Sequence, residues 1–210
     1  MDMKIYFNVA RKFNGRKKYI GRNHSIVKGK KFKNVPVFKI VPKDRKGSGV
    51  YDDVPIFEGF QYQLGLNVDT NVLDTRCFNG TGLYFASIDD IEEYMYVYGN
   101  TLAVLRIPEE EQVVVGYKKY RTHSVIVEDF MSLEDEKTWQ MLIDYGFRLR
   151  SNSTIILYYI IKNHIECVLP TINFSKISKY DLEKLLKDAK QFNNRNAEFF
   201  INEALKKNKG

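Results

Sequence analysis

The chain reads Thr81-Gly-Leu-Tyr-Phe-Ala-Ser87, then Ile88-Asp-Asp-Ile-Glu-Glu-Tyr-Met-Tyr-Val-Tyr-Gly99, then Thr101-Leu-Ala-Val-Leu-Arg-Ile107. The first and third parts are short, apolar and rich in aromatic or β-branched residues, which is typical of strands. In the middle part Ile88, Ile91, Met95 and Tyr98 recur at helical spacing, so we expect them to form the buried stripe of a helix that ends at Gly99. The stretch therefore predicts a strand, a helix and a second strand.

The totals exclude several classes of protein. A chain of 210 residues with 44% hydrophobic content can form one large domain, or one domain with an appendage. It contains no apolar run near the ~20 residues that cross a bilayer, and its first residues lack the apolar core of a signal peptide. We therefore expect neither secretion nor membrane insertion, and we expect Cys77 and Cys167 to be reduced thiols.

Positive charge is concentrated at the N-terminal end. Residues 1–46 contain 15 Lys or Arg and 2 Asp, a balance of +13, whereas the remaining 164 residues contain 18 Lys or Arg and 24 Asp or Glu, a balance of −6. Basic residues interleaved with aromatic ones suit RNA or DNA, because the cations neutralise phosphates and the rings stack on bases. The alternative is a solvated basic arm without a ligand. The candidate contacts are Arg11, Lys12, Phe13, Arg16, Lys17, Lys18, Tyr19, Arg22, Lys28, Lys30, Lys31 and Lys33.

The order of these patterns predicts an α+β fold in three segments. The first is the basic arm or hairpin, residues 1–46, ending in a loop around Gly47-Ser-Gly49. The second is a core, residues 47–130, with a small, mixed and mainly antiparallel sheet that also takes in the strand at residues 35–41. The third is an all-helical tail, residues 131–210. Further strands are expected at 54–66, 112–115 and 123–127. Helices are expected from a capping box at Ser132 and Asp135 to Gly146, at 154–163, at 165–169, at 178–192 with Ser178 as the N-cap, and at 196–207.

Several spaced motifs follow one another between residues 35 and 145. They are Gly59-Phe-Gln-Tyr62, Gly65-Leu-Asn67, Asp69-Thr70, Cys77, Thr81-Gly-Leu-Tyr-Phe85 and Tyr98-Gly99. Together they resemble a module of giant DNA viruses of the mimivirus group, which often precedes ankyrin repeats. Thr81 departs from the pattern, in which a second glycine is usual. The resemblance implies a viral protein that acts in the host cytoplasm, in the viral factory or in the virion.

The tail resembles parts of ankyrin repeats. Asp135–Gly146 looks like the end of one unit, and Ile156–Leu169 looks like a degenerate two-helix unit that turns at Asn163-His164. A full ankyrin array would recur every ~33 residues, and this tail has at most one blurred unit. The resemblance thus implies an ankyrin-like helical tail without a long recognition surface.

A weaker likeness concerns ADP-ribosyltransferases. The segment Gly82-Leu-Tyr-Phe-Ala86 with a following helix that carries Tyr94 is similar to theirs. Those enzymes need a histidine or arginine on an early strand and a glutamate on a late one. The early strand Val37–Val41 has neither. His123 and Ser124 stand where the glutamate is expected, and Glu128 lies past the apolar run of that strand. The likeness therefore implies the fold without the chemistry, and an active transferase is only a third alternative.

No other pattern predicts catalysis, a metal or a cofactor. The three histidines lie in separate segments without metal spacing, and no glycine-rich phosphate-binding motif is present. The run of acidic residues from Asp89 to Glu93 suits a solvated helix face better than an acid/base pair.

Tyr94, Tyr96 and Tyr98 alternate near the end of the expected helix, so we expect at least one of them to be exposed for an interaction. The leading interpretation is a non-enzymatic interaction or adaptor protein with a viral or host protein partner. The alternative is an RNA- or DNA-binding protein that uses residues 1–46.

Overall fold

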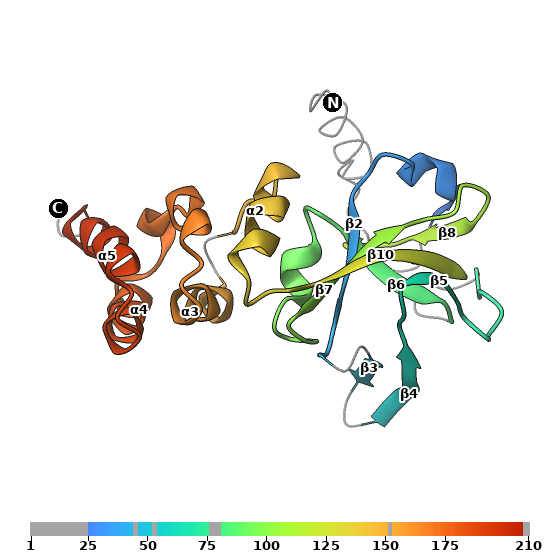
Figure 1. Cartoon of the computed structure of the whole chain (residues 1–210), viewed down its shortest axis with the longest axis horizontal. Helices are drawn as coiled ribbons and strands as arrows, with labels where there is room; N and C mark the ends of the chain where they lie inside the picture. The colour runs from blue at the N-terminus through green and yellow to red at the C-terminus, as the bar shows by residue number, and fades with distance from the viewer. Residues whose placement is uncertain (1–24, 44–45, 52–53, 76–80, 151–152, 208–210) are drawn as a thin grey trace. The chain divides into compact units, whose positions relative to one another are not determined.

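The structure is a computed structural model that describes residues 25–43, 46–51, 54–75, 81–150 and 153–207 (Figure 1). The chain divides into two compact units, Met1–Met131 and Ser132–Gly210. The division lies one residue from the expected start of the helical tail. In the described residues the first unit is built mainly of strands, and the second is helical.

The first unit is organised around an eight-stranded antiparallel sheet in the order β1-β8-β9-β6-β2-β7-β10-β5. Its strands are β1 (Ser25–Lys28), β2 (Val37–Val41), β5 (Gly65–Val68), β6 (Leu83–Ser87), β7 (Thr101–Arg106), β8 (Gln112–Val115), β9 (Tyr120–Thr122) and β10 (Ser124–Ser132). A separate hairpin consists of β3 (Lys46–Tyr51) and β4 (Val54–Gln61), so the loop expected around Gly47-Ser-Gly49 is wrong.

The sheet has two parts, β1-β8-β9-β6 and β2-β7-β10-β5, and the chain passes from one part to the other between β9 and β10. His123 joins β9 directly to β10. β9 pairs with β8 and β6, whereas β10 lies between β7 and β5. β6 pairs with β9 over its first residues and with β2 at its end, where Val37 faces Ser87. Strands from both parts therefore contribute side chains to one core.

Aromatic rings fill the centre of this core. Phe85 stacks on Tyr120 at 5.3 Å between ring centroids, and Phe32 meets both rings edge-on. Valine and leucine side chains of β2, β6, β7, β8 and β10 surround them. Burying one such side chain stabilises the fold by about 1.5–3 kcal/mol, so this core is what holds the strands in register.

The strands expected on either side of residues 88–99 are confirmed, but the helix between them is wrong. Only a 3-10 helix, η2 (Ile91–Tyr94), forms there. Met95 is already extended and Tyr96 has a left-handed backbone, φ 60°, so the helix cannot continue. Ile91 and Met95 are fully buried as expected, whereas Tyr98 is exposed.

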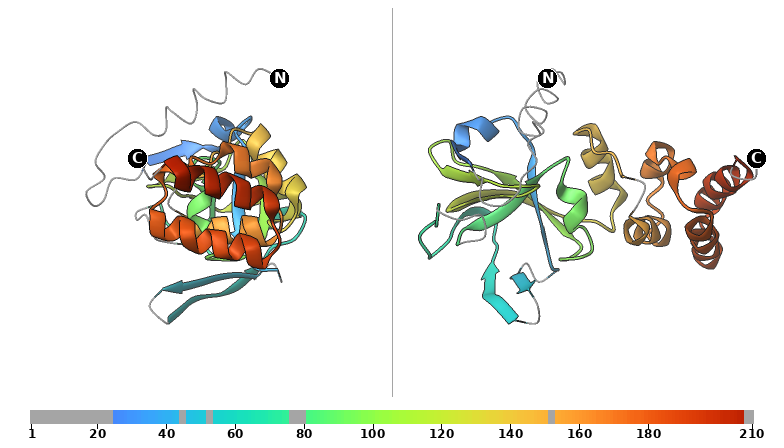
Figure 2. Two further views of the ribbon diagram at one scale, coloured as in Figure 1. Left: turned by 90° about the vertical axis from the view of Figure 1, so that its left-hand side faces the viewer. Right: turned by 180° about the vertical axis from the view of Figure 1, so that it is seen from behind.

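The second unit contains α2 (Glu136–Asp144), α3 (Thr154–Lys162), η3 (Glu166–Thr171), η4 (Phe174–Lys176), α4 (Lys179–Gln191) and α5 (Arg195–Lys207). Its described residues include no strand after β10 ends at Ser132. α4 and α5 lie side by side (Figure 2). The described part of this unit consists of helices and the segments that join them, and the expected ankyrin-like tail stays a prediction. No helix in the described ranges is long and apolar enough to span a membrane.

The cap expected at the start of one helix is confirmed, and the cap expected at the start of another is wrong. Ser178 caps α4 as expected, because its Oγ accepts a hydrogen bond from the Asp181 amide at 3.1 Å. The capping box expected at Ser132 is wrong: α2 begins at Glu136, and Asp135 precedes it without a side-chain cap.

Three helices of this unit end in the same way, with a left-handed residue that turns the chain. At each end the next amide bonds to a carbonyl five residues back, at 2.9–3.0 Å. Asn194, which is buried, follows the third of these turns and joins two helices. The side-chain Nδ2 of Asn194 donates to the Ile161 carbonyl at the end of α3, and its Oδ1 accepts a hydrogen bond from the backbone amide of Ala197 in α5. The left-handed residues are Gly146, His164 and Asn193.

Candidate protein-interaction site

The described part of the expected basic arm belongs to the sheet. β1 pairs with β8, and the 3-10 helix η1 (Gly29–Phe32) follows it against the turn that leads into β8. The Gly29 amide donates to the Glu111 carbonyl at 2.8 Å, and a Cβ on Gly29 would lie 1.9 Å from the Pro108 carbonyl oxygen. Only glycine allows so close an approach. The expected boundary at residue 46 therefore does not separate an arm from the core.

The same turn neutralises part of the positive charge. Lys33 Nζ lies 2.7 Å from Glu109 Oε1, and this pairing raises the pKa of Lys33 and lowers that of Glu109. Lys28 Nζ donates to the Glu110 carbonyl at 2.9 Å and lies 3.8 Å from its carboxylate. Lys30 and Lys31 are exposed. The other predicted contacts, Arg11, Lys12, Phe13, Arg16, Lys17, Lys18, Tyr19 and Arg22, lie outside the described residues.

A second group of predicted residues forms an aromatic surface. Tyr94 is half-buried, and its hydroxyl donates to the Lys118 carbonyl at 3.1 Å. Burial, followed by the neighbouring Glu93 and Asp90 carboxylates, raises the pKa of Tyr94 above its ordinary value. The Tyr98 ring lies 5.9 Å from that of Tyr94 and is 43% exposed. Tyr96 is only partly exposed.

The structure adds Tyr117 to this surface. Tyr117 is 62% exposed and lies in the turn between β8 and β9, which the Gly116 amide closes on the Lys119 carbonyl at 3.0 Å. Lys118 in the same turn forms an ion pair with Glu93, and its Nζ lies 5.2 Å from the Tyr117 ring centroid. We call the group of Tyr94, Val97, Tyr98 and Tyr117 the tyrosine patch. Sequence reasoning missed Tyr117, because no local pattern links this turn to residues 94–98.

Buried side chains and two polar contacts support the patch. Ile91 and Met95 are fully buried beneath it, and η2 packs against β2. The Tyr94–Lys118 hydrogen bond and the Glu93–Lys118 ion pair tie the two turns together. Exposed rings on supports of this kind lose little conformational entropy on binding, which favours an interface.

A different arrangement holds the loop between β5 and β6. Asp69 is buried, and its carboxylate accepts from the Gly82 amide at 2.8 Å and from the Asn71 amide at 2.9 Å. Arg121 of β9 is 1% exposed and donates to the carbonyls of Asp74 and Thr81. We call Asp69, Arg121 and these partners the polar clamp.

Asn67 organises the preceding turn by the same means. Its Oδ1 accepts from the Gln63 amide at 3.0 Å, and its Nδ2 donates to the carbonyls of Gln63 and Gly65. Asn67, Asp69, Thr81 and Gly82 all belong to the motifs that resemble the viral module. In this structure those four residues hold backbone in place, which is a structural task.

Sequence reasoning also missed Lys39, the one charged residue in the buried strand β2. Its Nζ donates to the Tyr84 carbonyl at 3.1 Å, in the part of β6 that pairs with β9 and precedes the residues that pair with β2. The same atom lies 5.2 Å from the centroid of the Tyr62 ring. Burial lowers the pKa of Lys39 to about 8. A lowered amine pKa can mark a functional site, but here the amine completes a hydrogen bond in the sheet.

Two of the positions named for the transferase likeness, Ser124 and Glu128, make other interactions. Ser124 Oγ donates to Glu111 Oε1 at 2.6 Å, and Glu128 forms an exposed ion pair with Arg106 at 2.8 Å. His123 Nδ1 is buried without a hydrogen-bond partner. In the part of the chain that the structure describes, no three acidic, histidine or cysteine side chains gather as metal ligands. Burial, then the Glu136 carboxylate, raises the pKa of the Cys167 thiol to about 11, so this thiol is protonated at neutral pH.

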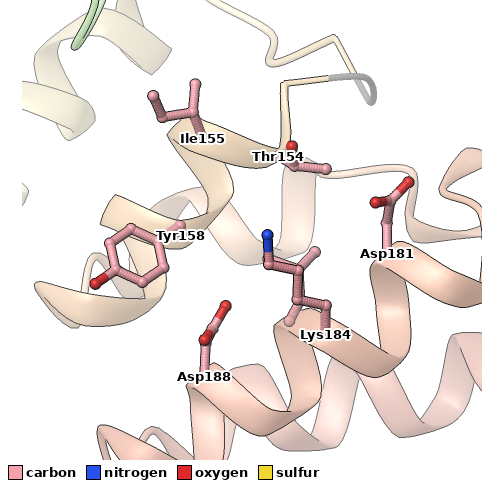
Figure 3. A pocket seen from close by; sticks show the side chains of 7 residues that line it. Thr154, Ile155, Tyr158, Asp181, Lys184 and Asp188 are labelled. Atoms are coloured by element: carbon pink, nitrogen blue, oxygen red, sulfur yellow. The ribbon is translucent and has the colours of Figure 1, made fainter.

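The second unit has a groove of about 270 Å³ between α3 and α4 (Figure 3). Asp181, Lys184 and Asp188 line it from α4, and Thr154, Ile155 and Tyr158 line it from α3. Small-molecule sites are usually larger, at about 300–1,000 Å³, and mostly apolar. With charged groups along one wall, this groove does not have the lining of such a site.

No protein-family model, no curated protein and no solved structure matches this chain.

Proposed function

We propose that the chain is a non-enzymatic interaction protein that binds a protein partner through the tyrosine patch. The observation that carries this proposal is the exposure of Tyr98 and Tyr117 above a fixed base. The resemblance to the giant-virus module supports a viral origin and a viral or host partner in the host cytoplasm.

The chemistry of the patch suits a protein partner. Tyrosine rings bury a large area on contact, and their hydroxyls accept or donate hydrogen bonds at the rim. Lys118 and Glu93 add one charge of each sign beside the rings, so the surface selects neither a strongly acidic nor a strongly basic ligand. Residues with these properties dominate the binding energy of many interfaces.

A capture experiment in host cells tests the proposal. Partners of the wild-type chain would be compared with those of the double variant Tyr98→Ser/Tyr117→Ser. Tyr180→Ser is the matched control, because Tyr180 is also exposed but lies on α4. We expect one set of partners to be lost with the patch variant and kept with the control. An unchanged set, or specific turnover of NAD or another nucleotide by the purified chain, would refute the proposal.

Nucleic-acid binding by residues 1–46 is the second candidate, and their balance of +13 favours it. The ion pairs of Lys28 and Lys33 reduce the contribution expected from residues 25–33, so the proposal rests on residues 11–22. A deletion test should therefore begin the chain at Ser25, because deletion to residue 46 would also remove β2 from the centre of the sheet.

Fluorescence anisotropy with labelled RNA and duplex DNA at two salt concentrations measures this second candidate. Binding that weakens steeply with salt and disappears in the chain that begins at Ser25 would support it. Equal binding by the two chains, or none by either, would exclude residues 11–22 as the contact.

A further inference from the structure

A separate surface lies at one end of the sheet, where β5 is an edge strand. β5 pairs with β10 on one side, and Leu66 stands opposite Ile126. Within the described residues no strand pairs with its other side. An edge of this kind presents free amides and carbonyls and is a template for another strand.

Apolar side chains lie along this edge with a period of two. Leu66 is 57% exposed and Val68 is 43% exposed, while Asn67 between them points into the unit and is buried. Leu64 is also exposed just before the strand. Leu66 and its cross-strand neighbour Ile126 share one face, so the apolar row continues onto β10.

The sequence of this edge lacks the charged residues and prolines that usually prevent association. The ten residues Gly59-Phe-Gln-Tyr-Gln-Leu-Gly-Leu-Asn-Val68 contain no charged side chain and no proline, in a chain that is 28% charged. Natural edge strands are commonly protected by lysine, proline or a cover. A neutral edge also suits a neutral occupant, and it adds no charge repulsion between copies of a chain whose net charge is +7.

We propose that a second copy of this chain occupies the edge by antiparallel pairing of β5 with β5, centred on Asn67. In that register Leu66 of each copy faces Val68 of the other, so the strand is complementary to itself. The two Leu–Val pairs lie on one face of a continuous sheet, flanked by both copies of Ile126. A two-fold contact of this kind is closed and produces a dimer.

This inference is independent of the tyrosine patch, because it rests on other residues and a different class of contact. A dimer would present two patches. A partner with two binding sites would then be held more tightly by effective concentration, although the patch itself is unchanged.

The first test measures molar mass by light scattering over a range of chain concentrations. We expect the mass of the wild-type chain to rise from 24.6 kDa toward twice that value. Leu66→Lys should keep the mass at 24.6 kDa, because a lysine there remains in water in the monomer but meets the apolar row of the second copy. Ile26→Lys is the matched control, since Ile26 is an exposed apolar residue of β1, the other edge strand.

Three results would overturn the proposal: a wild-type chain that is monomeric throughout, a dimer that Leu66→Lys leaves intact, or one that both lysine variants abolish equally. Circular dichroism checks that Leu66→Lys keeps the fold. A wild-type monomer that instead binds a foreign strand peptide at this edge would assign the edge to a partner and exclude the second copy.

A second test determines which residues of the two β5 strands face each other. In a background in which Cys77 and Cys167 are serine, chains with Leu66→Cys are mixed under mild oxidation with chains that carry Val68→Cys. Opposed residues of antiparallel strands lie ~4.5–5.5 Å apart between Cα atoms, within reach of a disulfide. The mixed disulfide should therefore form faster than that of either variant alone, and equal rates would contradict the register centred on Asn67.

Discussion

The polar clamp and the tyrosine patch belong to the same sheet unit, yet they use opposite kinds of residue. The clamp consists of a buried acid and a buried arginine whose partners are mostly backbone groups. The patch consists of exposed rings held by one hydroxyl and one surface ion pair. Among the residues that carry the resemblance to the giant-virus module, Asp69, Thr81 and Gly82 belong to the clamp, whereas Tyr98 belongs to the patch.

The difference predicts that changes in the clamp affect stability and that changes in the patch affect binding. Buried polar groups that lose their partners cost far more than exposed side chains that lose theirs. Substitutions in the clamp and in the patch therefore test this distinction.

Arg121→Met should have the largest effect. The variant leaves the carbonyls of Asp74 and Thr81 without the guanidinium in a buried site, and each such loss costs about 1–3 kcal/mol. We expect the free energy of unfolding to fall by about 3 kcal/mol in urea denaturation. Arg106→Met is the control, because Arg106 is exposed, and its ion pair with Glu128 should contribute under about 1 kcal/mol. Equal losses in the two variants would show that the clamp is not a structural centre.

Gly82→Ala tests the clamp at the residue whose backbone amide donates to Asp69. Gly82 has φ +123°, and an added Cβ would lie 2.7 Å from Leu73 Cδ1 and 3.0 Å from the Thr122 carbonyl oxygen. We expect a loss of about 2 kcal/mol, since strain and crowding act together. At Gly65 the φ is +88° with open space around it, so Gly65→Ala should cost only about 1 kcal/mol. Thermal unfolding of both variants measures the difference, and a larger loss at Gly65 would contradict it.

The parts of this molecule that could be predicted from its sequence are those set by local patterns. The strands at 83–87, 101–106 and 112–115 and the Ser178 cap follow from apolar runs and from one hydroxyl at the right spacing. The helix expected at 88–98 failed, because helical spacing did not reveal that Met95 would be extended and Tyr96 left-handed. The clamp joins residues up to 47 positions apart, and the patch joins turns more than twenty apart. Such groupings depend on strand order, which no local pattern determines.

Lys39 is intermediate between the clamp and the patch, because its half-buried amine has one hydrogen-bond acceptor and one aromatic ring near it among the described residues. The folded chain releases the Lys39 proton near pH 8, whereas an unfolded lysine holds it to about 10.5. Between these values the unfolded chain binds more protons, so stability should rise with pH. After allowance for the partial exposure of the side chain, we expect a gain of about 1–2 kcal/mol.

Above about pH 10 the trend should reverse. Burial raises the pKa of Tyr62 and Tyr94, so these hydroxyls stay protonated in the folded chain while unfolded tyrosines ionise, and stability falls. Urea denaturation from pH 7 to 10 measures the rising part. Lys39→Met should remove the rise and keep the fall. A wild-type chain whose stability does not change between pH 8 and 10 would show that the Lys39 amine titrates normally.

The smallest effects on stability should come from the patch. Tyr98→Ser and Tyr117→Ser remove exposed rings, and each should change the free energy of unfolding by no more than about 0.5 kcal/mol. Tyr94→Phe should cost about 1 kcal/mol, because it removes the hydrogen bond to the Lys118 carbonyl that joins the two turns. For binding to a captured partner, we expect the patch variants to have a larger effect than the clamp variants. Tyr98→Ser or Tyr117→Ser should weaken binding about 30-fold, which corresponds to about 2 kcal/mol. If Tyr98→Ser instead unfolded the chain as readily as Arg121→Met, the patch would be part of the core, and the contrast between a buried clamp and a binding surface would fail.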